Sequence, residues 1–259
     1  MSYFDRNYAT ARGAGRAVAI DAGLRAYMIR VYNTMAAGVA LTGVVSWLAF
    51  QLAGGDAIHI AAGRIVGLTA FGLLVYNPIF QLVLAFGSFG LAWYVSARIY
   101  QMTPGRALTL FMVYAGLLGL LLSTIFLAYV HISIVRVFFI SAASFGALSL
   151  YGYTTQRDLA PFGAFLVMGL FGLVAAILVQ MVLGFFGVFS SAFDFVISVG
   201  GVLIFAGLTA FDTQQIKEMY SEMDDGTVAG RKAVFGALKL YLDFINLFLF
   251  MLRLFGDRR

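Results

Sequence analysis

Long stretches without a charged residue alternate with short charged segments along the chain. The uncharged runs cover residues 31–55, 65–97, 107–135, 137–156, 159–193 and 195–211. A helix needs about 20 mostly apolar residues to cross the hydrocarbon core of a bilayer. Most of these runs are long enough, so the pattern predicts a helical protein that spans a membrane.

Prolines and charges indicate where the spans begin. Proline fits the first turn of a helix, so Pro78 and Pro104 are expected to open the second and third spans. The first run is too long for the core of a signal peptide, which has about 7–15 residues. We expect seven spans in all. Arg136 and Arg157 bracket the fourth, and Pro161 precedes the fifth. The sixth is expected over residues 193–216 and the seventh over 233–254.

The remaining segments complete the expected organisation. Residues 1–26 form a polar N-terminal tail, 27–256 the membrane domain and 257–259 a C-terminal tail. Residues 57–75 are expected to be a loop or a helix lying on the membrane interface. Small residues at helix-contact spacing, such as Ala115/Gly119 and Ala142/Gly146, would let helices approach closely in lipid. The predicted fold class is all-α, a seven-helix transmembrane bundle.

Composition narrows the protein class further. Hydrophobic residues make up 62% of the chain and charged residues 11%, whereas a soluble domain carries about 25% charged residues. Cysteine is absent, which excludes disulfides and thiolate metal sites. The two histidines lie far apart in the sequence and do not favour a zinc site. No nucleophile–base set, phosphate loop or cofactor fingerprint is present, so we expect no enzyme and no bound cofactor.

The basic residues indicate orientation. The net charge is +5, and the basic residues cluster between apolar runs, which favours contact with anionic lipid over nucleic acid. The larger basic set lies in the connections on the side of the N-terminus, so that terminus is expected in the cytoplasm. The basic C-terminus then lies outside after seven full crossings, against the rule, or the last helix does not cross completely. The sequence leaves both open.

The last span contains an acid surrounded by apolar residues. Asp243 stands in "LYLDFINLFLF", and Lys239, Asn246 and Arg253 lie close to it on a helical wheel, within about 40° of one another. A charge at the bilayer centre costs about 3 kcal/mol or more unless it faces protein or water. The seventh helix is therefore expected to be interior, with its polar stripe turned away from lipid.

The sixth span carries a related stripe. Asp194 and Asp212 are separated by 18 residues, or five helical turns, so they share a face, and Ser198, Phe205 and Thr209 fall on or near it. A water-lined track with an apolar gate at Phe205 would have this pattern. A chance alignment in a tightly packed helix would also have it.

Structural interpretations stand beside these functional ones. Asp212 is also compatible with an interfacial position at a helix end. Gln214 is also compatible with a solvent-exposed position at the same helix end. Asp243 is also compatible with a structural ion pair to Lys239, four residues earlier. Arg98, near the end of the second span, is by default a cytoplasmic anchor.

The two aspartates together suggest a site. The sixth and seventh spans are consecutive and joined by about 16 residues, which favours an antiparallel pair. At about 1.5 Å rise per residue, Asp212 and Asp243 can both lie in the cytoplasmic half of the membrane. Two carboxyl groups in a low-dielectric site would share a proton. When deprotonated they offer oxygen ligands to a divalent cation, so a weak calcium site is expected there.

Several motifs resemble one family. "FAGLTAFDTQQIKEMY" (205–220), "GALKLYLDFINLFLFMLRLFG" (236–256) and "FGALSLYGYTTQRDL" (145–159) are similar to motifs of the Bax inhibitor-1, or transmembrane Bax-inhibitor-motif, family. The resemblance extends from about residue 25 to 256 and is strongest to the bacterial branch. It implies a bacterial inner-membrane location.

The resemblance also implies a fold and an activity. It implies six helices around a central polar seventh, and a pH-sensitive calcium leak controlled by aspartates that match Asp212 and Asp243. Arg98 is the nearest match to an arginine that latches to the first of these acids in some bacterial members. The family usually has tyrosine before that acid, whereas this chain has Phe211, so the pH midpoint does not carry over.

Three functions follow as hypotheses. The first is a calcium-permeable leak channel that uses Asp212, Asp243 and Asn246, with calcium and protons as its ions and no cofactor. The second is a non-conducting regulator that binds other membrane proteins, such as a quality-control protease, as some bacterial relatives are described. The third is a proton-coupled transporter, which the lack of an internal inverted repeat does not favour.

Overall fold

The computed structural model describes residues 3–61, 64–188 and 190–259, and it describes side chains from residue 22 onward except at 60–64 and 189. Seven of the described helices are long and apolar enough to cross a membrane. They are α1 (Tyr3–Ala53), α3 (Pro78–Arg98), α4 (Pro104–Leu122), α6 (His131–Thr154), α7 (Ala160–Phe185), α8 (Ser191–Glu218) and α9 (Gly226–Phe255). The all-α, seven-span prediction is confirmed.

Local sequence explains where these helices start. Pro78 and Pro104 lie in the first turns of α3 and α4, as predicted, and the residues before them are caps: the Asn77 side chain accepts from the N–H of Ile79, and Thr103 from that of Arg106. Each cap satisfies a backbone N–H that has no partner within the helix.

Two helices begin earlier than the charge pattern predicts. The fourth span starts at His131, so Arg136 lies inside it, and the seventh starts at Gly226 instead of Ala233. The reason at α9 is its cap, because the Asp225 carboxylate accepts from the N–H of Val228 at 2.7 Å. A capped helix can include polar residues that a count of apolar positions leaves out.

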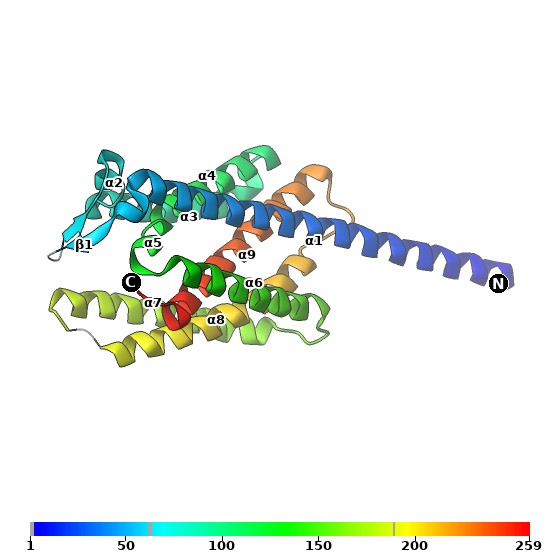
Figure 1. The fold of residues 1–259 in the computed structure, drawn as a ribbon. Coiled ribbons are helices and arrows are strands. Elements are labelled where there is room, and N and C mark those ends of the chain that lie inside the picture. The colour runs from blue at the N-terminus through cyan, green and yellow to red at the C-terminus, as the bar shows by residue number, and fades with distance from the viewer. Residues whose placement is uncertain (1–2, 62–63, 189) are drawn as a thin grey trace.

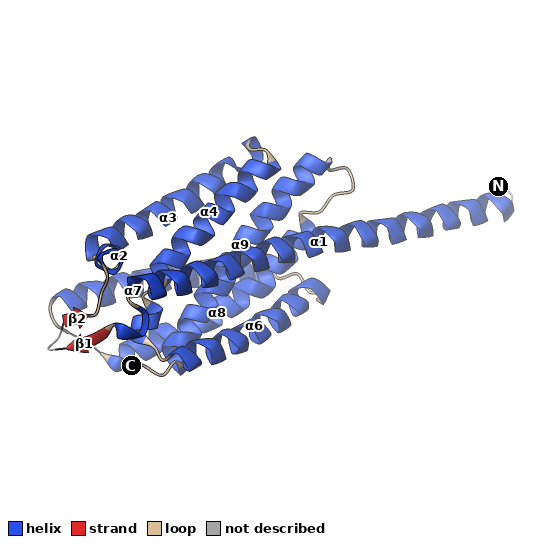
Figure 2. Cartoon of the chain, turned by 45° about the horizontal axis from the view of Figure 1, so that its top comes forward, coloured by secondary structure: helices blue, strands red, loops and turns tan. Residues whose placement is uncertain are grey.

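The connection between α1 and α3 differs from the expected loop or interfacial helix. It contains a 3₁₀ turn, η1 (Gly55–Ala57), and a small antiparallel hairpin, β1 (His59–Ala61) with β2 (Arg64–Val66), in which Ile60 pairs with Ile65. The short helix α2 (Ala70–Val75) follows. Two further short elements, η2 (Ile99–Gln101) and α5 (Ile125–Ala128), follow α3 and α4. Figure 2 shows the hairpin at one end of the bundle.

The long helices form two layers with α9 between them (Figures 1 and 2). In one layer α4 packs between α1 and α3, and in the other α8 packs between α6 and α7. The helix α9 packs against α1 and α4 of the first layer and against α6 and α8 of the second. Its most apolar window is 72% buried, compared with at most 33% for any other span. This is six helices around a central seventh.

The two ends of the chain lie at opposite ends of the bundle. The guanidinium of the C-terminal Arg259 lies 3.8 Å from the carboxylate of Asp56, just beyond the end of α1. The N-terminal part of α1 extends away from the bundle on the other side (Figure 1). The helix α9 therefore runs the whole length of the bundle, as seven full crossings require. The side of the membrane on which the C-terminus lies stays a prediction.

Glycines permit the closest helix contacts. A β-carbon at Gly119 of α4 would lie 2.8 Å from the carbonyl oxygen of Thr42 in α1, and one at Gly152 of α6 would overlap the carbonyl oxygen of Ala210 in α8. The Ala115/Gly119 pair therefore lies at a helix contact, as predicted. Gly146 does not, because a β-carbon there would meet nothing within 4 Å.

Candidate functional site

The structure brings Asp212 and Asp243 together. Asp212 lies six residues before the end of α8 and Asp243 lies in the central part of α9. Their carboxyl groups are within hydrogen-bonding range of each other, and each residue is only 4% exposed. A hydrogen bond between two carboxyl groups needs one proton on the pair. The pair is therefore an interior site and neither acid faces the acyl chains.

Lys239 joins this pair from α9. Its Nζ lies 2.8 Å from Oδ1 of Asp212 and 2.6 Å from Oε1 of Gln215, both in α8. The ammonium group also lies over the ring of Phe211, 5.6 Å from the ring centroid. The aromatic residue that stands where the family usually has tyrosine therefore makes a cation–π contact. The lysine thus pairs across the helix interface with Asp212, and not mainly within its own helix with Asp243.

Asp243 has an unsatisfied oxygen. Its Oδ2 is buried and has no hydrogen-bond partner among the described residues. A buried acceptor without a partner costs about 1–3 kcal/mol. A cation bound at this oxygen would remove that cost.

Hydrogen bonds hold the end of α8 in place around the pair. Gln214 accepts from the N–H of Leu159 at 2.8 Å and donates to the carbonyl oxygen of Arg157 at 2.8 Å. Lys217 donates to the carbonyl oxygen of Tyr153 at 2.9 Å. The residue Gln214 is 8% exposed, so the solvated position considered for it is wrong. These bonds could not be predicted from the sequence, because their partners are backbone groups at the end of α6 and in the segment between α6 and α7.

A chain of hydroxyl groups lies beside the acid pair. The hydroxyl of Tyr32 in α1 is 2.6 Å from Oγ of Ser149 in α6, which is 2.9 Å from Oγ1 of Thr213 in α8. Thr213 in turn donates to the carbonyl oxygen of Thr209. Three helices are thus linked next to Asp212.

Asp194 lies at the other end of α8, about 27 Å from Asp212 at 1.5 Å per residue. Its carboxylate is 3.3 Å from the guanidinium of Arg258 and 3.9 Å from that of Arg253, and it accepts from Gln180. The structure does not bring it to the aspartate pair. It belongs to an ion cluster at the end of the bundle where the C-terminus lies.

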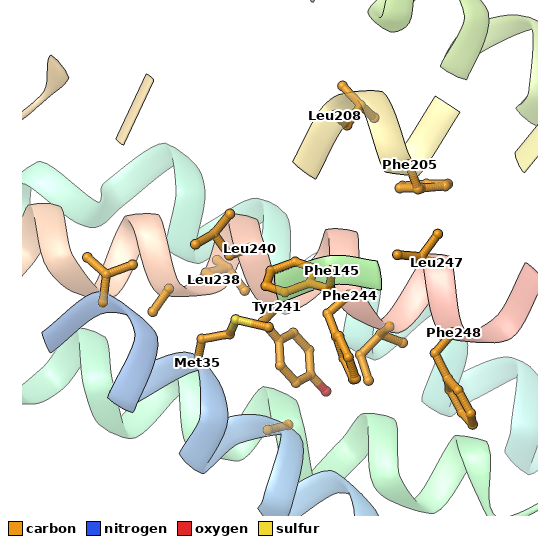
Figure 3. Packing of buried hydrophobic residues seen from close by; sticks show 14 of the residues in the cluster. Met35, Phe145, Phe205, Leu208, Leu238, Leu240, Tyr241, Phe244, Leu247 and Phe248 are labelled. Carbon is orange, nitrogen blue, oxygen red and sulfur yellow. The ribbon is translucent and has the colours of Figure 1, made fainter. Parts of the chain in front are cut away.

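The other residues of the α8 stripe are buried against their neighbours. Ser198 donates to the carbonyl oxygen of Asp194 and Thr209 to that of Phe205, both within α8. The ring of Phe205 stacks on that of Phe250 in α9, with centroids 5.8 Å apart. Figure 3 shows Phe205 directed from α8 toward α9. The aromatic stack lies between the two acidic ends of the stripe.

The helix α9 has one partly accessible stripe. Between Lys232 and Arg253 every residue that is not buried falls at a spacing of three or four, and these residues are Lys232, Phe235, Lys239, Leu242, Asn246, Leu249 and Arg253. Asn246 donates to the carbonyl oxygen of Leu242. Lys239, Asn246 and Arg253 therefore share the face of α9 that the surrounding helices cover least, whereas Asp243 is buried beside it.

Arg98 lies elsewhere in the structure. Its side chain is exposed and donates to Oε1 of Gln101 at 3.0 Å. The cation recorded within ion-pair distance of Asp212 is Lys239. The structure therefore does not bring Arg98 to the aspartate pair, and the cation that lies there is Lys239, which was expected to pair with Asp243 and pairs with Asp212 instead. The signal was present, because Lys239 shares a face with Asp243.

The site offers few metal ligands. No group of three or more histidine, aspartate or glutamate residues is found in the part of the chain that the structure describes. The carboxyl oxygens of two residues fall short of the 6–8 oxygen ligands that calcium takes.

The chain matches the family model described as inhibitor of apoptosis-promoting Bax1 over residues 24–259. It is 42% identical to the inner membrane protein YbhL of Escherichia coli over 240 residues, which are 92% of this chain and 94% of the relative. A Rickettsia prowazekii protein is 41% identical over 92% of each chain. A Caulobacter vibrioides protein is 39% identical over the full length of both chains.

Proposed function

The chain belongs to the Bax inhibitor-1 family, and on this premise we propose that it is a pH-sensitive, calcium-permeable leak channel. It is an integral inner-membrane protein, as its relatives and its seven apolar helices indicate. We propose further that the N-terminus lies in the cytoplasm, because Arg25, Arg98, Arg106 and Arg157 belong to the side with more basic residues.

One observation supports gating by the aspartate pair. Two buried carboxyl groups face each other with a single ammonium group, that of Lys239, bound to one of them. The three groups together are neutral when the pair holds one proton. Addition of a second proton removes the negative partner of Lys239, whereas loss of the shared proton leaves a net negative charge that a cation can neutralise.

The proposed gate follows from this balance. At neutral pH the Lys239–Asp212 ion pair ties α9 to α8 and keeps the path closed. As pH falls, Asp212 is protonated, the ion pair is lost and α8 can move from α9. Lys239 thus takes the latching role that the family resemblance suggests for Arg98, whose own latching role stays a prediction.

The proposed path follows the accessible stripe of α9 from Lys239 to Arg253. Calcium would pass the aspartate pair and Asn246, and would be held weakly because these ligands do not form a full oxygen cage. Weak binding suits conduction, since an ion must leave the site as readily as it enters. No enzymatic reaction is part of this proposal.

Calcium entry into liposomes that contain the purified protein, followed at several pH values, tests the proposal. We expect entry to rise as pH falls in the unmodified protein, and Asp243→Asn to change both the rate and its pH dependence. Asp158→Asn is the matched control, because Asp158 is exposed in the connection between α6 and α7 and accepts only from the N–H of Ala160, far from the pair in sequence. A pH response that is the same in Asp243→Asn and in the unmodified protein would refute the role of the pair.

One observation favours the second candidate, a regulator that binds other membrane proteins. The ribbon of α1 before residue 22 extends past the other helices of the bundle, where a partner could reach it (Figure 1). Removal of residues 3–21 separates the two candidates. A regulator loses its partner while calcium entry persists, whereas a channel without a partner keeps its full activity in cells.

A further inference from the structure

The two layers leave a seam between α1 and α6. Both helices pack on α9, but they make few contacts with each other. The seam contains a cleft of about 620 Å³, lined by Met28, Ile29 and Tyr32 of α1 and by Phe145, Gly146 and Leu150 of α6. This volume lies in the range of about 300–1,000 Å³ typical of ligand sites.

The seam continues along both helices. A second cleft of about 300 Å³ lies farther along it, between Val39 and Gly43 of α1 and Phe139 of α6, with Phe244 of α9 at its base. From Arg25 to Ser46 the seam is about 31 Å long at 1.5 Å per residue, close to the roughly 30 Å of a hydrocarbon core. The clefts therefore lie at the depth of lipid acyl chains, on the side of α9 opposite to its polar stripe.

Glycines widen both clefts. A β-carbon built at Gly43 or at Gly146 would meet nothing within 4 Å. The side walls are recessed at these positions, and no described protein side chain fills the space. The hydroxyls of Tyr32 and Ser149 lie in the wall of the larger cleft, but they bond to each other at 2.6 Å. What the wall offers a ligand is therefore apolar.

One cation lies at the mouth of the larger cleft. Arg25 lines it and stands three residues after the start of the first span, at the level of the lipid headgroups. No hydrogen bond or ion pair is recorded for its side chain among the described side chains. An apolar cleft in the acyl-chain region, with a guanidinium at its headgroup end that has no partner among the described side chains, matches a molecule with an apolar chain and an anionic head. Arginine also suits phosphate, because its fork of donors binds two oxygens at once.

We propose that the cleft between α1 and α6 binds one acyl chain of an anionic phospholipid whose phosphate group pairs with Arg25. The lipid comes from the leaflet on the side of the N-terminus. Its chain fills the recess at Gly146 and covers the exposed side chain of Leu150.

Native mass spectrometry of the purified protein tests this proposal. The detergent-solubilised protein is titrated with phosphatidylglycerol and, separately, with phosphatidylcholine that has the same acyl chains. We expect one phosphatidylglycerol per chain and about fivefold weaker retention of phosphatidylcholine, the effect of one basic residue at an anionic surface. Arg25→Gln should abolish this preference, whereas Arg30→Gln, on another face of α1, should keep it.

Filling the cleft tests the acyl-chain half of the proposal. Gly146→Phe should remove the bound lipid, and Ile29→Trp should do the same from the opposite wall. Gly172→Phe is the matched control, because Gly172 of α7 is also exposed with nothing within 4 Å of a β-carbon. Lipid retention unchanged in both filled variants would overturn the proposal. Equal retention of the two lipids by the unmodified protein, or a dimer in place of the lipid adduct, would also overturn it.

Discussion

The ammonium group of Lys239 sets the charge that the two buried acids present. Its position one turn before Asp243 suggested a pair within one helix, but the structure turns it toward α8, 2.8 Å from Asp212. A buried ion pair holds two elements in register, and removal of one partner leaves an uncompensated charge. Lys239 is therefore a positioning residue for the pair and for the contact between α8 and α9.

Lys239→Met should open the path at neutral pH. The variant loses the link from α9 to Asp212 and leaves two acids without a cation, so we expect higher basal calcium entry and a weaker response to acid. Calcium entry into proteoliposomes at pH 7 and pH 5 measures both. Lys232→Met is the matched control, since Lys232 lies in the same helix but pairs at 2.6 Å with Asp224 in the preceding loop. Basal entry equal to that of the control would contradict the latch.

Phe205→Ala should raise basal calcium entry without removing its pH dependence. The Phe205 ring stacks on Phe250 between the two acidic ends of α8, and its loss would leave an opening between α8 and α9. Truncation of a buried phenylalanine costs about 3–5 kcal/mol of stability, so the unfolding temperature must be followed as well. Phe195→Ala serves as control, because Phe195 is 61% exposed on the same helix. No increase over the unmodified protein would count against a gate at Phe205.

At the scale of elements, the contact between α6 and α8 depends on one glycine. The backbones of Gly152 and Ala210 approach so closely that a β-carbon at Gly152 would overlap the Ala210 carbonyl oxygen. Small residues permit this approach in lipid, where helix association depends on packing. The contact holds α8 in register next to Thr213 and the acid pair.

Gly152→Val should therefore separate α6 from α8. Overpacking of this kind costs about 1–3 kcal/mol or more, which we expect to see as a lower unfolding temperature in detergent. Gly90→Val in α3 is the control, since a β-carbon there meets nothing within 4 Å. If both variants unfold at the same temperature, the close approach is not needed for stability.

The start of α9 shows how much local sequence predicts for an element. The apolar pattern suggested a start at Ala233, but the cap at Asp225 extends the helix to Gly226. Capping is a local signal, and it was present in the sequence. The hydrogen bonds of Gln214 could not be predicted in this way, because only the packing of α8 against the end of α6 brings Leu159 and Arg157 to it.

At the scale of the whole molecule, the C-terminal segment joins parts of the bundle that are distant in sequence. The backbone of Arg258 pairs with that of Tyr129, and Asp257 accepts from Arg136 at 2.9 Å. The side chain of Arg258 reaches Asp194 in α8. These contacts fasten the end of α9 to α6, to α8 and to the connection before α6.

Removal of residues 257–259 should lower stability modestly. The lost ion pairs are exposed and contribute about 0–1 kcal/mol each, and each lost backbone hydrogen bond contributes about 1 kcal/mol. A lower unfolding temperature of the truncated protein in detergent is the expected result. The variant Arg258→Gln keeps the backbone hydrogen bonds, so its unfolding temperature should lie between those of the full chain and the truncated protein. An unfolding temperature equal to that of the full chain would show that the segment fastens nothing.

The sequence by itself determined the membrane class, the seven spans and the two acids that lie within apolar surroundings. These features follow from composition and from local periodicity, which each segment carries alone. Only the tertiary structure decided that Lys239 and not Arg98 lies at Asp212, that Phe205 stacks on Phe250, and that α1 and α6 leave a seam open. The physical reason is that such contacts depend on how helices rotate and cross when they pack, and no single helix encodes the position of its neighbour.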